Sequence, residues 1–218
     1  MIVDLADALR CIRPHEPAAL ITSVDRLAGR QIVTGSLGCP VCDARYPVVE
    51  GAAVFDMAWL DRSRAAPPAP AAGEAAVIRV GALLDLTDPA GWVLLEGGIS
   101  GAGAALHALL DTAVVLLNPP GAVPVGGDVS VIYAPVVPFS PGLLRAAALS
   151  QGVDPGLADS VVPALRAGGR IMGPVSVSVP SGVAELARDA LGWVGTRRAA
   201  EPTSVPVSLS RGRRHHSA

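Results

Sequence analysis

Three cysteines and one histidine have the spacing of a metal site. Cys39 and Cys42 form a Cys-Pro-Val-Cys pair, which presents two thiolates to one ion from a tight turn. Cys11 supplies a third ligand, and because Pro14 stands where a matching second pair would end, His15 is the nearest candidate for the fourth. Structural zinc is held tetrahedrally by four ligands of these types. The spacing therefore predicts a zinc site formed by Cys11, His15, Cys39 and Cys42.

Two other interpretations of the cysteines are open on the residues alone. Cys-Pro-x-Cys is also a redox pair of thioredoxin-like proteins, but there the motif begins a helix, whereas the residues from Tyr46 to Val49 predict a strand. In a protein without metal, Cys11 would instead pack as a small apolar side chain. The strand after Cys42 favours the metal site.

Composition and charge bound the class of protein. A chain of 218 residues is long enough for one ordinary domain and a smaller one. The net charge of −2 gives no bulk attraction to nucleic acid or to an anionic membrane. Charged residues interrupt the N-terminal segment, and no uncharged helical stretch is long enough to span a bilayer. We expect a cytoplasmic protein without a membrane partner. Cysteines in the cytoplasm are more often metal ligands than members of disulfides.

Lysine is absent, so all 17 basic residues are arginine. Mechanisms that need a Schiff-base amine or a P-loop lysine are therefore excluded. The absence also argues against a short-chain dehydrogenase, because Val137 stands where the lysine of a Tyr-x3-Lys pair would follow Tyr133.

The chain divides at a Pro/Ala-rich segment that lacks apolar periodicity. We expect a β-rich ribbon over 1–60, a linker over 61–76, an α/β domain over 77–200 and a solvated tail over 201–218. Periodicity in the third segment predicts helices over 77–86, 103–110, 158–165 and 182–191, and strands over 91–96, 112–117, 129–134, 170–179 and from 193 onward. This alternation predicts a Rossmann-like, mostly parallel sheet flanked by helices, shorter by one strand than is usual.

The turn after the strand over 91–96 is the expected ligand site. Its glycines let a ligand approach the backbone, and a helix N-terminus follows them. In a parallel sheet, Asn118 at the end of the next strand lies at the same edge. The predicted pocket is bordered by Gly97, Gly98, Gly101 and Asn118, and the predicted cofactor-binding residues also include Glu96 and Gly103.

The N-terminal quarter resembles the Trm112-like zinc-ribbon family. The resemblance rests on Leu9-Arg-Cys11, on Leu37-Gly-Cys-Pro-Val-Cys42 and on Tyr46-Pro-Val-Val-Glu-Gly51. The chain departs from the family by lacking the second cysteine of the first half-site. Members of this family bind and stabilise class I methyltransferases, so the resemblance implies a protein partner bound through the ribbon.

The downstream segment resembles class I S-adenosylmethionine-dependent methyltransferases. Glu96-Gly-Gly-x2-Gly101-x-Gly103 is similar to their first motif, and the run from Leu165 to Met172 is similar to a late turn of their fold. The resemblance implies S-adenosylmethionine as the cofactor. Asn118 stands where the family has the acidic residue that holds the ribose, which is a departure.

Two functions follow from these observations. The chain is either a methyltransferase-like protein with a fused zinc ribbon that binds S-adenosylmethionine, or a non-catalytic binding or scaffold protein with a degenerate Rossmann-like domain. The sequence identifies no catalytic residue and no substrate.

Overall fold

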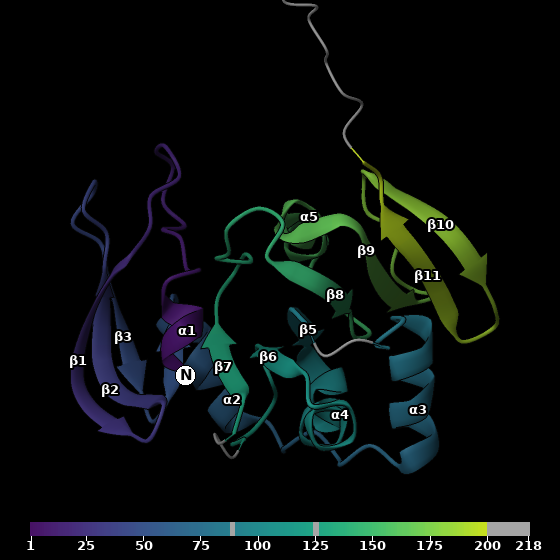
Figure 1. Ribbon diagram of the computed structural model, residues 1–218, viewed down its shortest axis with the longest axis horizontal. Helices are drawn as coiled ribbons and strands as arrows, with labels where there is room; N and C mark the ends of the chain where they lie inside the picture. The colour runs from purple at the N-terminus through teal and green to yellow at the C-terminus, as the bar shows by residue number, and fades with distance from the viewer. Residues whose placement is uncertain (88–89, 124–126, 200–218) are drawn as a thin grey trace, which may run out of the picture.

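Eleven strands form one continuous sheet in the part of the chain that the structure describes, residues 1–87, 90–123 and 127–199 (Figure 1). In this computed structural model the strands lie in the order β1-β2-β3-β4-β7-β6-β5-β8-β9-β11-β10. Their bounds are β1 Ile21–Ala28, β2 Gln31–Gly38, β3 Arg45–Val49, β4 Ala52–Val54, β5 Trp92–Glu96, β6 Ala113–Leu117, β7 Val129–Tyr133, β8 Leu144–Ala148, β9 Leu165–Pro174, β10 Val183–Arg188 and β11 Gly192–Arg197.

The centre of the sheet is parallel and doubly wound. Numbered along the chain from β5, the strands β7, β6, β5, β8 and β9 lie in the order 3-2-1-4-5, and each pairs in parallel with its neighbours. β6, β7 and β8 are almost wholly buried, as expected for apolar strands covered on both faces. The order of the strands reverses between β5 and β8, which is where ligands of such folds bind.

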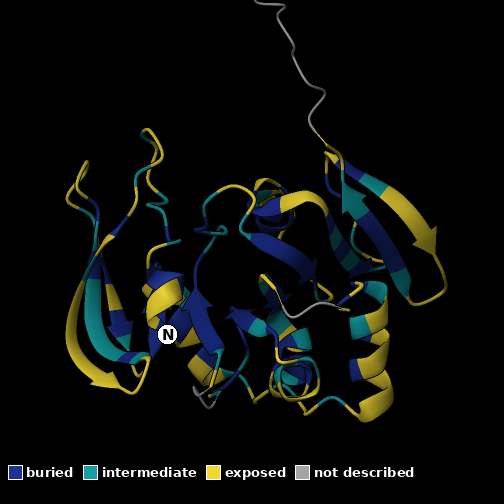
Figure 2. Ribbon diagram, in the orientation of Figure 1, coloured by how far each residue is buried: buried dark blue, intermediate teal, exposed yellow. Residues whose placement is uncertain are grey.

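Helices cover both faces of this centre. The helices are α1 Val3–Ala6, α2 Met57–Ala65, α3 Glu74–Leu83, the 3-10 helix η1 Gly97–Ala102, α4 Gly103–Leu110 and α5 Pro155–Ala164. Buried residues of α2, α3 and α4 share one hydrophobic cluster, while those of α1 and α5 share the other, on the opposite side of the sheet. The buried strands between these layers are visible in Figure 2. None of the helices in the described ranges is long and apolar enough to cross a membrane.

The N-terminal ribbon extends the same sheet. β1, β2, β3 and β4 form antiparallel hairpins, and β4 then pairs in parallel with β7. All three residues of β4 are buried. Leu9 forms a bridge with Phe139, so the start of the chain is also joined to the α/β region. The segments that carry the predicted metal ligands are thus joined to the α/β region both through β4 and through Leu9.

The linker is shorter than the sequence indicates. α2 continues to Ala65 and α3 begins at Glu74, which leaves 66–73 between the two helices. This segment lies on the α/β region, because Ala69 N–H donates to Pro120 O and Ala72 N–H donates to Gly101 O. The predicted tail over 201–218 lies outside the described residues.

Two predictions of secondary structure are wrong. The segment predicted as a helix over 182–191 is β10 and the turn after it, because it pairs with β11 as an antiparallel hairpin. The sheet is also not one strand short, since Leu144–Ala148 forms β8 between β5 and β9. The other predicted elements are present with shifted ends: β9 runs from Leu165 to Pro174 rather than over 170–179, and α5 begins at Pro155.

Candidate functional site

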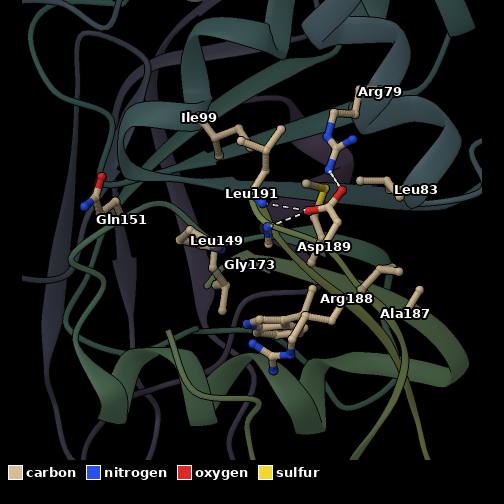
Figure 3. A pocket seen from close by; sticks show the side chains of 15 residues that line it. Arg79, Leu83, Ile99, Leu149, Gln151, Gly173, Ala187, Arg188, Asp189 and Leu191 are labelled. Atoms are coloured by element: carbon tan, nitrogen blue, oxygen red, sulfur yellow. Dashed lines mark hydrogen bonds and ion pairs between the residues drawn. The ribbon is translucent and has the colours of Figure 1, made fainter. Parts of the chain in front are cut away.

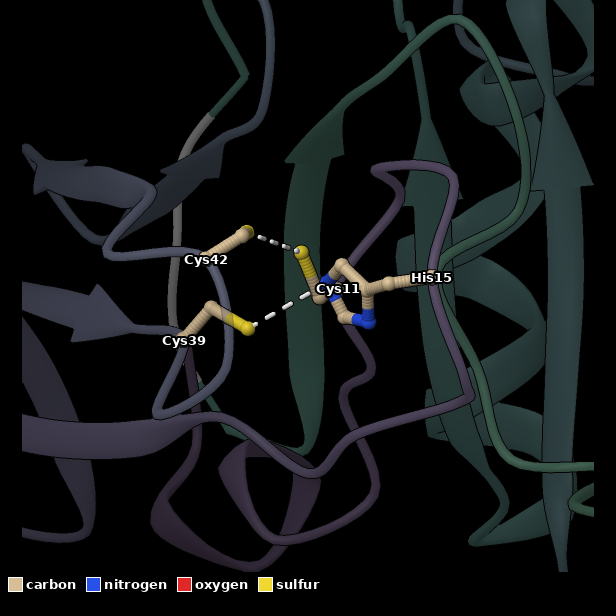
Figure 4. A group of neighbouring side chains, drawn as sticks. All are labelled: Cys11, His15, Cys39 and Cys42. Carbon is tan, nitrogen blue, oxygen red and sulfur yellow. Dashed lines mark hydrogen bonds between the residues drawn. The ribbon is translucent and has the colours of Figure 1, made fainter.

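The four predicted metal ligands lie together. The ligand atoms of Cys11, His15, Cys39 and Cys42 are all within 4.8 Å of one another. Figure 4 shows Cys39 and Cys42 approaching from one loop, with Cys11 and His15 opposite them. Cys11 Sγ is 3.7 Å from Cys42 Sγ, and Cys39 Sγ is 3.4 Å from His15 Nε2. A tetrahedral zinc ion would set two sulfur ligands about 3.8 Å apart and a sulfur and a nitrogen about 3.6 Å apart. The cluster therefore has the dimensions of a four-ligand metal site.

Local backbone bonds shape the two half-sites. In the loop after β2, Cys39 N–H donates to Ala44 O over 2.8 Å, and Val41 N–H donates to Cys39 Sγ over 3.4 Å. Asp43 in this loop adopts a left-handed φ of 56°, which aspartate tolerates. In the other half-site, Cys11 N–H donates to Ala18 O over 3.0 Å. Both half-sites are thus loops that are closed by backbone hydrogen bonds.

Neighbouring groups orient two of the ligands. His15 Nδ1 lies 2.6 Å from Glu16 O, and because a carbonyl can only accept, Nδ1 carries the proton and Nε2 is free to bind a metal. Tyr46 Oη lies 3.2 Å from Cys11 Sγ. Burial raises the pKa of Tyr46 to about 12, so its hydroxyl keeps its proton and can donate to the sulfur. These contacts resemble the outer shell that fixes metal ligands in other proteins.

The glycines of the predicted ligand turn have different surroundings. Gly97 has a left-handed φ of 58°, and a Cβ there would collide with Ser150 Oγ. A Cβ at Gly101 would collide with the carbonyl oxygen of Pro70, and a Cβ at Gly103 would lie 2.7 Å from Leu116. Of these four glycines, only Gly98 has no other atom within 4 Å of the position that a Cβ would take. At the other three glycines, the space that a side chain would need is therefore occupied by other residues of the same chain.

Glu96 is turned toward the end of β8. Its Oε2 accepts hydrogen bonds from Ser150 N at 3.0 Å and from Ser150 Oγ at 2.7 Å, and the residue is 5% exposed. Burial raises the pKa of Glu96 above its ordinary value, although the bonds from Ser150 act in the opposite direction. Gly97 permits this arrangement because a side chain there would displace Ser150. The pair joins the two strands at which the sheet order reverses.

Asn118 is engaged by the backbone at the end of β7. Its Nδ2 donates to Ala134 O over 2.8 Å, and its Oδ1 accepts from Ala134 N over 2.9 Å. The residue is buried and has a left-handed φ of 50°, so both its side chain and its backbone are committed to this junction. Asn118 and Gly101 thus lie at the expected edge of the sheet, with their hydrogen-bonding atoms or adjacent space taken up by other parts of the chain.

A cavity of about 320 Å³ lies at the reversal point (Figure 3). It is bordered by η1, by the residues after β8, by the end of β9 and by the turn between β10 and β11. Of the predicted site residues, neither Glu96, the four glycines nor Asn118 lines it. The lining residues are Arg79, Leu83, Ile99, Leu149, Gln151, Met172, Gly173, Pro174, Ala187, Arg188, Asp189, Leu191, Gly192, Trp193 and Val194.

Sequence reasoning misses this cavity for a physical reason. Several of its residues come from the hairpin of β10 and β11, the first strand of which the local sequence predicts as a helix. Trp193 forms one wall, and its ring lies so close to Gly173 that a Cβ there would be 2.8 Å from Trp193 Cζ2. Gly173 on β9 lies opposite Trp193 on β11 in their antiparallel pair. This pairing would indicate the wall of the cavity, but it can be recognised only when the register of the two strands is known.

Comparison with known proteins gives likenesses to solved structures only. No family model matches the chain, and no curated protein matches it. The fold is similar to geranyl diphosphate C-methyltransferase from Streptomyces coelicolor A3(2), with 18% identity and a TM-score of 0.39 over 45% of this chain and 43% of that one. It is also similar to tRNA (m1A58) methyltransferase TrmI from Aquifex aeolicus, with 13% identity and a TM-score of 0.40 over 57% and 69% of the chains. The antibiotic-resistance methyltransferase Kmr is similar with 13% identity and a TM-score of 0.38, over 57% of this chain and 93% of that one. This chain thus spans less than half the length of the first of these proteins.

Proposed function

We propose that this is a non-catalytic binding protein in which a zinc-holding, Trm112-like ribbon is fused to a methyltransferase-like α/β domain. The observation that carries the proposal is the double hydrogen bond between Asn118 and Ala134. A residue in that position would have to offer its polar atoms to the ribose of S-adenosylmethionine, and both atoms are already bonded to the backbone.

The other groups around the turn support the same proposal. Pro70 lies against Gly101, where a ligand would need the space that the missing Cβ leaves. Glu96 is buried and bonded to Ser150. The residues around the turn therefore do not fit S-adenosylmethionine in the arrangement that the family resemblance implies.

Zinc is the metal that we propose for the Cys11, His15, Cys39 and Cys42 cluster. Three thiolates and one imidazole are a common donor set for structural zinc, and four protein ligands leave no open position for catalysis. Metal analysis of protein purified from zinc-replete cells should give about one zinc per chain. A protein that is folded and contains no zinc would show that the cluster is a relic.

A protein partner is proposed for the ribbon. β1 is an edge strand, and the side chains of Ile21 and Leu27 on it are 65% and 53% exposed. An Ile21→Asp and Leu27→Asp double variant should lose a stoichiometric partner that co-purifies with the wild type and is identified by mass spectrometry. Leu186→Asp on β10, at the other edge, is the matched control and should keep it.

A second candidate function is S-adenosylmethionine-dependent methyl transfer. The observation that favours it is the open space at Gly98, at the turn where such a ligand would approach.

Calorimetric titration of the zinc-loaded protein with S-adenosylmethionine and with S-adenosylhomocysteine separates the two functions. Our proposal expects no binding of either compound. Saturable binding that Gly98→Val abolishes, without loss of thermal stability, would instead establish the turn as a cofactor site. Binding that survives Gly98→Val would place such a site elsewhere in the domain and would equally overturn the proposal.

A further inference from the structure

We propose that the cavity at the reversal point between β5 and β8 binds a neutral, largely apolar small molecule. This site is separate from the metal cluster and does not include the residues that the resemblance assigns to a cofactor. Its position follows a general rule, since ligands of doubly wound sheets bind outside the carboxyl ends of the strands at which the order reverses.

The walls of the cavity are mostly apolar. Leu149 and Trp193 are buried, and Ile99, Leu83 and Met172 are half-buried around the same space. The indole N–H of Trp193 donates to Val177 O over 2.7 Å, so the ring offers only carbon surface to a ligand. Packing of that ring against Gly173 holds it in place. The site is thus a preformed apolar surface, of the kind that encloses small molecules.

The charged residues at the rim compensate one another. Arg79 Nη2 is 2.6 Å from Asp189 Oδ2, and Arg188 forms two hydrogen bonds with Glu185, at 3.0 and 2.6 Å. Figure 3 shows the Arg79 and Asp189 side chains meeting at the edge of the cavity. An anionic ligand would have to compete with Asp189 for Arg79, and a cationic ligand would face the reverse competition. Balanced rim charges therefore favour a ligand without net charge.

One polar side chain of the lining is uncharged. Gln151 follows β8, is exposed, and carries both a donor and an acceptor. It can form a hydrogen bond with one polar group of the ligand. The volume of about 320 Å³ suits a molecule of two or three rings and is small for a peptide. These features define the class as a compact, neutral, mainly hydrophobic compound with at most a few polar atoms.

The test uses two fluorescent probes of nearly the same shape. N-phenylnaphthylamine is neutral, and anilinonaphthalene sulfonate adds one negative charge to the same ring system. We expect the neutral probe to bind saturably, at one site per chain. The sulfonate should bind at least about tenfold more weakly. Failure of the neutral probe to bind, or equal binding of the two, overturns the proposal.

Variants locate the binding and test the charge argument. Ile99→Trp should fill the cavity and abolish binding of the neutral probe, whereas Ile78→Trp, on the exposed side of α3, should leave it unchanged. Asp189→Asn leaves Arg79 uncompensated and should strengthen binding of the sulfonate about threefold relative to the neutral probe. Arg79→Gln should shift that ratio in the opposite direction. Probe binding that ignores Ile99→Trp, or a probe ratio that neither rim variant changes, would also overturn the proposal.

Discussion

Asn118 and Ala134 hold the ends of β6 and β7 together through two hydrogen bonds, because the side-chain amide of Asn118 donates to the backbone C=O of Ala134 and accepts from its N–H. The arrangement imitates a strand pair just beyond the last paired residues of β6 and β7, Leu117 and Ile132. A carboxylate could make only one of these bonds, because it cannot donate to Ala134 O. Asparagine at this position is therefore explained by the fold, without a ligand.

Replacing Asn118 by alanine should lower the free energy of unfolding by on the order of 2 kcal/mol, because the buried Ala134 N–H and C=O lose their partner. Urea denaturation measures the change. Asn118→Asp should also destabilise the protein, since it sets an oxygen against Ala134 O. Gln151→Ala, an exposed change, is the control. Unchanged stability in Asn118→Ala would mean that the amide is not structural.

The four predicted metal ligands should contribute unequally to the affinity for zinc. Cys39→Ser should reduce zinc affinity more than His15→Ala does, because a lost thiolate removes charge, whereas water can replace the imidazole. Competition with a chromogenic chelator gives both affinities. His107→Ala, which changes a histidine outside the cluster, is expected to retain the wild-type affinity. Equal losses for His15→Ala and His107→Ala would remove His15 from the ligand set.

The adjacent glycines Gly97 and Gly98 should respond differently to the same substitution. Gly97→Ala should lower stability by about 1–2 kcal/mol, since alanine disfavours its left-handed φ, and by more if Ser150 is displaced. Gly98→Ala should stay within about 0.5 kcal/mol of the wild type, because nothing lies within 4 Å of the new methyl group. Thermal melts of the two variants test this directly. The opposite order would show that the turn has another backbone conformation.

Glu96 should make stability depend on pH. Its pKa is raised in the folded protein above the ordinary 4.5, so its contribution is fully present below that value and is lost as the pH rises through the folded pKa. Glu96→Gln stays neutral and can still accept from Ser150, so its stability relative to the wild type should increase as the pH rises above about 4.5. Denaturation at several pH values tests this. Ser150→Ala should enlarge the wild-type dependence, because the ionised carboxylate loses a donor. A pH-independent difference between Glu96→Gln and the wild type would contradict the assignment.

The metal cluster can be predicted because its chemistry is local to a few residues. Cys39 and Cys42 share one turn, and thiolates have few other uses at that spacing. His15 is harder to predict, since its role depends on the loop that returns it to Cys39. The parallel strands β5, β6 and β7 are predictable from their apolar runs for the same local reason.

The predictions fail where pairing between distant segments decides the structure. β8 has the sequence Leu-Arg-Ala-Ala-Ala, with low intrinsic strand preference, yet it is buried between β5 and β9. β10 contains Ala, Glu, Leu and Arg, which favour helix, but Asp189 accepts hydrogen bonds from Leu191 N and Gly192 N and turns the chain back into β11. In both segments the neighbouring strands override local preference.

The glycine turn shows why a motif can suggest a ligand that the fold does not require. Glycine marks a close approach to the backbone, and the sequence cannot say what approaches. At Gly101 it is Pro70, and at Gly103 it is Leu116. Both partners lie outside the motif, so the pattern looks the same with or without a cofactor.

The pairing of β4 with β7 limits the order in which parts of the sheet can form during synthesis on the ribosome. All four predicted metal ligands and the hairpins of β1, β2 and β3 precede β7 in the chain, so they are synthesised before it. β4 has no parallel partner until Val129–Tyr133 has emerged, and Leu9 has none until Phe139 has. Until then the three apolar residues of β4 form an unpaired strand edge of the nascent ribbon, and such edges are sites of aggregation.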